Sequence, residues 1–72
     1  MQIVINGQSR ELAGLSAAPT VAEVIAALDL KGDRVAIEHN GTIVSRAEWA
    51  AAVVRDGDRF EIVHFVGGGA GW

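Results

Sequence analysis

Residues 20–30, TVAEVIAALDL, carry the clearest helix signal in the chain. Their apolar residues recur at helical spacing and form one stripe: Val21, Val24, Ile25 and Leu28. Thr20 and Glu23 have the form of a capping box, in which the threonine hydroxyl accepts an amide N–H and the glutamate reaches back. The pattern predicts a helix that begins after Thr20 and ends near Leu30, with Gly32 as its end signal.

Short β-branched runs on either side of this segment predict strands. Residues 2–6 form the first, and Asn6-Gly7 is a hairpin signal that predicts a return strand over residues 9–13. A second hairpin is predicted in the same way over residues 34–45, where Asn-Gly recurs.

The last third of the chain adds a short helix and a final strand. Residues 45–48, SRAE, repeat the capping-box form and predict a helix over residues 46–51, anchored by Trp49. Asp56-Gly57-Asp58 predicts a turn, and residues 59–66 predict the last strand, which we expect beside the first strand and parallel to it. One amphipathic helix can cover only one face of a mixed sheet, so the element order predicts a two-layer α+β domain.

Composition narrows the function classes. The chain has 72 residues, half of them apolar, which suits one small domain with a core. It has no cysteine, which excludes disulfides, a zinc–thiolate site and a thiol nucleophile on this chain and is compatible with a cytoplasmic protein. The net charge is −3 and the basic residues are scattered, so we expect no nucleic-acid partner. No apolar run approaches the length of a membrane span, and we expect no membrane partner.

The chain offers no set of residues for catalysis. His39 and His64 are separated by 25 positions without metal-ligand spacing, and His39 is expected on a hairpin surface. No base is adjacent to the serines to activate them. Asp56 and Asp58 resemble a paired-carboxylate site, but their spacing around Gly57 is more typical of a turn. We therefore predict neither an active site nor a metal site.

The last strand predicts a partner surface. Alternate residues point to opposite faces, and only one face can lie under the helix. Apolar area left exposed is typical of partner sites. The candidate surface residues are Phe60, Ile62, His64 and Phe65. The alternative is that loops or the segment around Trp49 cover this area.

Residues 67–72, GGGAGW, follow the last strand and offer almost no side chains. Glycine costs more backbone entropy to order than any other residue and contributes nothing to a core. We therefore predict a domain over residues 1–66 and a flexible tail over residues 67–72. One interpretation is a frayed end or a cloning remnant. The other is a thin tail that enters a narrow slot in a partner, where hydrogen bonds grip its backbone.

Several of these stretches resemble the thiamine-biosynthesis sulfur carriers, the ThiS family. The similarity covers residues 1–69, and its specific part is residues 56–69, DGDRFEIVHFVGGG. The hairpin at Asn6-Gly7, the helix start at Thr20-Val21 and residues 44–49 also agree. The resemblance implies a ubiquitin-like β-grasp fold, with a mixed sheet of about five strands packed on one helix.

The resemblance also implies a carrier and not an enzyme. In the family, an E1-like adenylating enzyme uses ATP to activate the terminal glycine carboxylate. Sulfur from a donor such as a cysteine desulfurase then replaces AMP, and the thiocarboxylate delivers it to thiazole synthase. By position, the reacting carboxylate belongs to Gly69, and tail recognition belongs to Val66, Gly67 and Gly68. The carrier itself binds no cofactor.

The chain departs from the family pattern after Gly69. Ala70-Gly71-Trp72 ties the Gly69 carboxylate into a peptide bond, which should prevent adenylation. These residues are interpreted as a pro-segment for a trimming protease, a cloning remnant, or the mark of a carrier for another pathway. Such pathways include molybdopterin synthase, whose small subunit shares the fold and the tail, and natural-product or cysteine biosynthesis. A noncatalytic β-grasp interaction module and a modifier joined to lysines are further alternatives.

Overall fold

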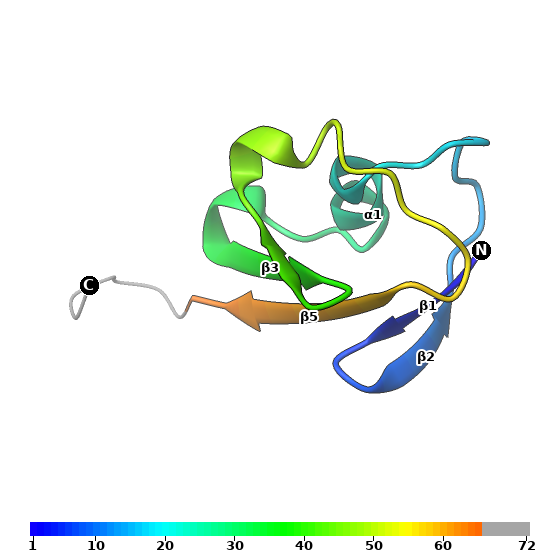
Figure 1. Cartoon of the computed structure of the whole chain (residues 1–72), viewed down its shortest axis with the longest axis horizontal. Coiled ribbons are helices and arrows are strands. Elements are labelled where there is room, and N and C mark those ends of the chain that lie inside the picture. Colours follow the sequence, from blue (N-terminus) through cyan, green and yellow to red (C-terminus); the bar gives the residue numbers. More distant parts are fainter. Residues whose placement is uncertain (66–72) are drawn as a thin grey trace.

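A computed structural model describes residues 1–65, in which a five-stranded mixed sheet carries one helix on one face (Figure 1). The strand order is β2-β1-β5-β3-β4. The elements are β1 (Gln2–Ile5), β2 (Gln8–Glu11), α1 (Val21–Ala27), η1 (Gly32–Arg34), β3 (Val35–His39), β4 (Thr42–Val44), η2 (Arg46–Glu48) and β5 (Arg59–His64). The predicted two-layer β-grasp fold is confirmed.

β5 is the central strand of the sheet. It pairs in parallel with β1, where Val4 is opposite Arg59 and Ile5 is opposite Phe60. It pairs antiparallel with the whole of β3, from Val35 opposite His64 to His39 opposite Phe60. The predicted parallel pairing of the first and last strands is confirmed.

Both hairpins turn at the predicted Asn-Gly pairs. Asn6 and Gly7 have φ of 49° and 82°, and Asn40 and Gly41 have φ of 50° and 86°. Two successive residues in the left-handed region match the twist of an antiparallel pair, and asparagine and glycine tolerate that region best. The return strand β2 occupies Gln8–Glu11 and so begins and ends earlier than predicted.

The core lies between the sheet and α1. The apolar stripe of the helix contributes Val21, Val24 and Ile25, each at most 4% exposed, whereas Leu28 is only partly buried. The sheet contributes Ile3, Ile5, Val35, Ile37, Phe60 and Ile62. Trp49 is also buried, and its indole N–H donates to the carbonyl of Val44 at 3.0 Å. The predicted anchoring role of Trp49 is therefore confirmed.

The end of α1 differs from the prediction. The helix ends at Ala27, and Asp29 has a φ of 58°. A residue in this left-handed conformation ends the helix, because the following backbone can no longer continue the ladder. Aspartate adopts it more readily than most residues, so Gly32 is not the end signal. Gly32 instead begins η1.

The predicted capping box forms, and Ser16 adds two further bonds to it. Thr20 Oγ1 accepts from the amide of Glu23 at 3.3 Å, as predicted. The Glu23 carboxylate accepts from the amide and the hydroxyl of Ser16, at 2.6 and 2.7 Å, and its interaction with the Thr20 backbone also lowers its pKa, as the capping box predicts. The loop before the helix folds over its first turn and supplies these donors. The bond from the Ser16 amide, followed by that from its hydroxyl, lowers the pKa of Glu23.

The predicted helix over residues 46–51 is only the 3₁₀ turn η2. The Ser45 hydroxyl donates to the Glu48 carboxylate at 2.9 Å and makes no capping bond to the backbone. After Trp49 the chain pairs with the start of α1 instead of continuing a helix. The amide of Val21 donates to Ala52, and the amide of Val54 donates to Pro19.

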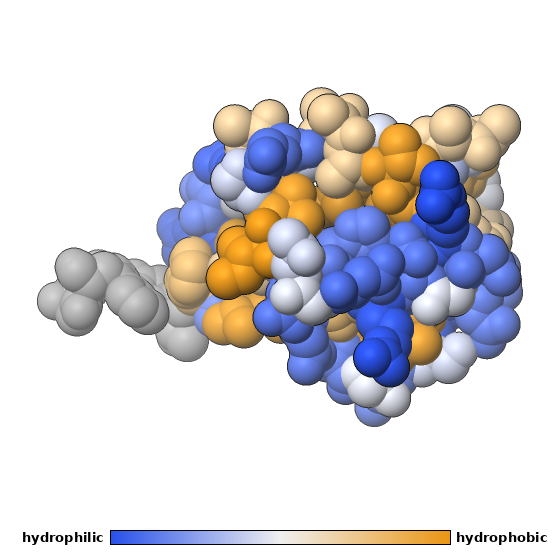
Figure 2. All heavy atoms as spheres, viewed as in Figure 1, coloured by the Kyte–Doolittle hydropathy of each residue, from blue (hydrophilic) through white to orange (hydrophobic). Residues whose placement is uncertain are grey.

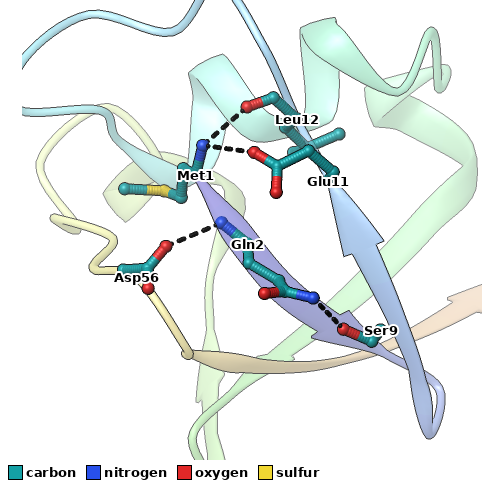
Figure 3. Close-up of polar contacts among 6 residues, drawn as sticks. All are labelled: Met1, Gln2, Ser9, Glu11, Leu12 and Asp56. Atoms are coloured by element: carbon teal, nitrogen blue, oxygen red, sulfur yellow. Dashed lines mark hydrogen bonds and ion pairs between the residues drawn. The ribbon is translucent and has the colours of Figure 1, made fainter.

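The amino-terminal end is held by polar contacts (Figure 3). The α-amino group of Met1 lies 2.9 Å from the carboxylate of Glu11 and donates to the carbonyl of Leu12. The amide of Gln2 donates to Asp56 at 2.7 Å. These contacts join both strands of the first hairpin to the turn that precedes β5. They lie at the opposite end of the molecule from the end of β5 (Figure 1).

Candidate functional site

The predicted site begins where β5 ends. Phe65 is the last described residue, and its amide donates to the carbonyl of Arg34 at 2.8 Å, which extends the pairing with the β3 side by one step. Four predicted site residues follow it: Val66, Gly67, Gly68 and Gly69. They, residues 70–72 and the predicted domain boundary lie outside the described residues.

Two of the predicted partner-surface residues are in the core. Phe60 is 1% exposed and Ile62 is 6% exposed, because their side chains point to the face that α1 covers. The prediction of a partner surface is therefore wrong for Phe60 and Ile62. His64 has the same parity but is exposed, and Phe65 is 40% exposed. The sequence correctly indicated that this strand has apolar residues on both faces. It placed two of the core-facing residues, Phe60 and Ile62, on the partner surface.

An exposed apolar patch lies on the opposite face of the sheet. It consists of Ile43, Val63 and Phe65, which are 75%, 58% and 40% exposed, and is called the outer patch here. Ile43 lies on β4 beside Glu38 and Val63 lies on β5 beside Ala36, so Glu38 and Ala36 of β3 separate the two ends of the patch. Figure 2 shows hydrophobic residues gathered at the end of the molecule where β5 ends, with hydrophilic residues over much of the rest of this view. The alternation of β5 already indicated Val63, whereas Ile43 had no comparable signal.

His39 does not lie on an open hairpin surface as predicted. Its side chain is 13% exposed and stacks on the Phe60 ring, with 4.8 Å between ring centroids. His39 Nε2 lies 2.7 Å from Asp58 Oδ2, which also accepts from the Arg55 amide at 2.9 Å. Burial by itself raises the pKa of Asp58, but the hydrogen bonds from Arg55 and His39 hold that pKa below its ordinary value.

These contacts give the two carboxylates of the turn over residues 56–58 a structural role. Asp58 accepts from the Arg55 amide within the turn, which confirms the predicted turn role for Asp58, whereas Asp56 accepts from Gln2 and so ties the turn to β1. Among residues 1–65, no cluster of three or more histidine, cysteine or acidic residues is placed to hold a metal ion. None of the helices described is long and apolar enough to cross a membrane.

Comparison with known proteins identifies the family. The family model of the ThiS family matches residues 3–69. This chain belongs to the ThiS family. A ThiS-family relative, the sulfur carrier protein ThiS of Escherichia coli K12, is 36% identical over 69 residues, which are 96% of this chain and the whole of that protein.

Two further relatives are much longer than this ThiS-family chain. The thiazole synthase of Paramagnetospirillum magneticum is 41% identical over 70 residues, and that of Magnetococcus marinus is 35% identical over 69. The match covers 97% and 96% of this chain but only 21% and 20% of those proteins. The chain therefore spans about one fifth of these thiazole synthases, each of which includes a ThiS-like stretch.

The fold of a solved ThiS protein agrees with the one described here. The crystal structure of thiamine biosynthesis protein ThiS from Geobacter metallireducens superposes with a TM-score of 0.79 at 32% identity. The match covers 94% of this chain and 99% of that one. The ThiS-type β-grasp fold is therefore the fold of the described residues, 1–65.

Proposed function

We propose that this chain is a sulfur carrier of thiamine biosynthesis and that its reacting group is the carboxylate of Gly69. The observation that carries the proposal is the match over the full length of a protein named as a sulfur carrier, in a chain whose central strand leads into a glycine run.

The chemistry begins with activation of a poor electrophile. A carboxylate oxygen of Gly69 attacks the α-phosphorus of ATP in an adenylating enzyme and releases pyrophosphate. The resulting acyl adenylate has AMP as a good leaving group. The terminal sulfur of a donor persulfide bonds to the carbonyl carbon, and AMP departs. A thiol then cleaves the S–S bond, which leaves the thiocarboxylate on Gly69 and a disulfide on the donor side.

Glycine suits this chemistry for a steric reason. The reacting end must enter at least two active sites, and a Cβ would keep the enzyme backbone from approaching closely. Gly67 and Gly68 remove that obstacle on the approach to Gly69. Ordering such a segment costs about 1–2 kcal/mol per residue, so the slot must supply backbone hydrogen bonds in return.

We propose thiazole synthase as the sulfur acceptor. The support is the pair of thiazole synthases that include a stretch similar to almost all of this chain. We also assign a docking role to the outer patch, because Phe65 directly precedes the residues that lead to Gly69. Exposed apolar patches of this kind mark protein interaction sites. The adenylating enzyme and the synthase would use it in turn.

Ala70-Gly71-Trp72 must be removed before the carrier can act. The Gly69 carboxylate is part of a peptide bond in the sequence as printed, and an amide oxygen has no carboxylate charge with which to attack ATP. We propose that a protease cleaves the peptide bond between Gly69 and Ala70.

Intact mass tests this proposal. The full chain and a chain ending at Gly69 are each incubated with the adenylating enzyme of the same organism, ATP, a cysteine desulfurase and cysteine. The shorter chain should gain the mass difference between one sulfur and one oxygen, and the full chain should not change. In the shorter chain, Gly69→Leu should slow the reaction, whereas the control Arg55→Ala, at an exposed position, should not. Equal conversion of both chains, with Trp72 retained, would exclude Gly69 as the reacting residue.

A further inference from the structure

The backbone of β5 alternates between two neighbours. The carbonyls of Asp58 and Phe60 accept from Val4 and Asn6 on the β1 side, at 2.9 Å each. The amide and carbonyl of Ile62 face the same side, where they pair with the side chain of Asn6 at 2.7 and 3.1 Å. Even-numbered residues of β5 therefore direct their backbone polar groups toward β1.

Odd-numbered residues direct theirs toward β3. The carbonyl of Arg59 accepts from Asn40, and the amide of Phe65 donates to Arg34. By this alternation His64 faces the β1 side, but β1 ends at Ile5 and the Asn6 side chain reaches only Ile62. Within residues 1–65, the strand pairing supplies no partner to His64 on that edge.

A groove of about 390 Å³ lies beside this edge. The first hairpin, the end of α1 and the end of β5 line it, with apolar side chains from Ile5, Leu28, Leu30 and Ile62 and polar ones from Asn6, Gln8, Arg10 and His64. Its lining includes the cation Arg10 and no carboxylate, in a chain whose net charge is −3. Arg10 also makes no ion pair with the other residues described. The groove thus combines an apolar lining with a basic rim.

We propose that thiazole synthase adds an extended strand to β5 at His64. The strand would bond to the N–H and C=O of His64, place one apolar side chain in the groove and bring an acidic side chain to Arg10. Extended segments bind open sheet edges in this way, with backbone bonds for affinity and alternate side chains for specificity. The glycine run begins three residues after His64. The synthase would therefore grip this chain only five positions before Gly69 in the sequence. This inference rests on the proposed function, since it names the sulfur acceptor.

The first test removes the free amide. His64→Pro deletes an N–H that the sheet does not use, and the preceding Val63 is already in the extended conformation that proline requires. His64→Ala deletes the imidazole and keeps the N–H. Affinity for the thiazole synthase of the same organism is measured by calorimetry, with the full chain and with the chain ending at Gly69. His64→Pro should weaken binding about 10-fold or more, and His64→Ala less than about 3-fold, because only the first removes a backbone bond.

The second test reverses the basic rim. Arg10→Glu should weaken binding about 10-fold at low salt and less at 0.5 M salt, where charges are screened. Arg55→Glu is the matched control, because it changes the net charge equally and does not line the groove. It should leave the affinity within about 2-fold of the wild type, since surface charges away from an interface act weakly. Neither residue is buried, so both variants should fold.

The outcomes separate the two proposals. Equal affinity of the wild type, His64→Pro and Arg10→Glu would overturn the added strand and leave the sulfur carrier intact. A wild type that gains sulfur but does not bind the synthase would also overturn the added strand. A wild type that neither gains sulfur nor binds the synthase would overturn both. A His64→Pro variant that unfolds would leave the decision to Arg10→Glu.

Discussion

The two halves of β5 are built differently. In the first half, Phe60 and Ile62 are buried and the backbone is bonded on both sides, to β1 or Asn6 and to β3. In the second half, Val63 and Phe65 are exposed and the described pairing lies on the β3 side alone. Under the proposed function, one half of the strand stabilises the domain and the other leads to the reacting residue, so the two tasks use different residues.

The largest effect is expected in the first half. Phe60→Ala should destabilise the protein by about 3–5 kcal/mol, because it leaves a cavity in the core and removes the stack under His39. That is a large part of the ~5–15 kcal/mol typical of a domain. Urea unfolding measures it, with Val63→Ala as the control on the same strand. A smaller loss at Phe60 than at Val63 would contradict the division of β5.

A smaller loss of stability is expected when the Asn6 side chain, which bonds to the backbone of Ile62 and is called the Asn6 clamp here, is removed. Asn6→Gly keeps the left-handed backbone but removes both side-chain bonds to Ile62, at a cost of about 1–3 kcal/mol. The control is Asn40→Gly, which removes the exposed bond to the Arg59 amide and the weaker side-chain contacts with His39 and Asp58, and it should cost less. Denaturant midpoints compare the two variants. An unchanged midpoint for Asn6→Gly would show that the clamp does not hold β5.

Low pH should reduce the stability of the protein through Asp58, in the turn that precedes β5. The pKa of Asp58 is lowered in the folded protein, so its unfolded form binds a proton at higher pH. Its contribution is complete at neutral pH and is lost as the pH falls below about 4. Between pH 7 and pH 3 the wild type should lose about 1 kcal/mol more than Asp58→Asn, the size of one net hydrogen bond. If the free energy of unfolding changed with pH in the same way in both proteins, Asp58 would not be a source of the acid sensitivity.

The smallest change in stability is expected at the outer patch. Val63→Thr and Ile43→Thr keep a β-branched side chain at exposed positions and should change stability by less than about 0.5 kcal/mol. They should nevertheless slow sulfur loading, if the patch docks on the adenylating enzyme. Loading is followed by intact mass, with the exposed Thr42→Ser as the control. Unchanged loading in both variants would show that the patch is not a docking surface.

The sequence was sufficient where a signal is local. The stripe of α1, the two Asn-Gly turns and the alternation of β5 each lie within a few residues, and the structure confirms them. Contacts between distant residues could not be predicted. Asn6 meets Ile62 across 56 positions, and His39 meets Asp58 across 19, because the fold itself brings them together.

The error about Phe60 and Ile62 has a related cause. Alternation separates the two faces of a strand, but it does not say which face the helix covers. The opposite set, with Val63 and Phe65, had equal support from the pattern alone. The burial of Phe60 depends on the register of β5 against β1 and β3, and only the assembled sheet shows it.

Amide hydrogen exchange along β5 tests the division of this strand most directly. An amide exchanges slowly when its hydrogen bond must open first. In the free chain, the amides of Ile62 and Val63 should be protected, and that of His64 should exchange at nearly the rate of an unstructured peptide. With thiazole synthase bound, the His64 amide should become protected while Ile62 changes little. A His64 amide as protected as Ile62 in the free chain, or one unaffected by the synthase, would contradict the account.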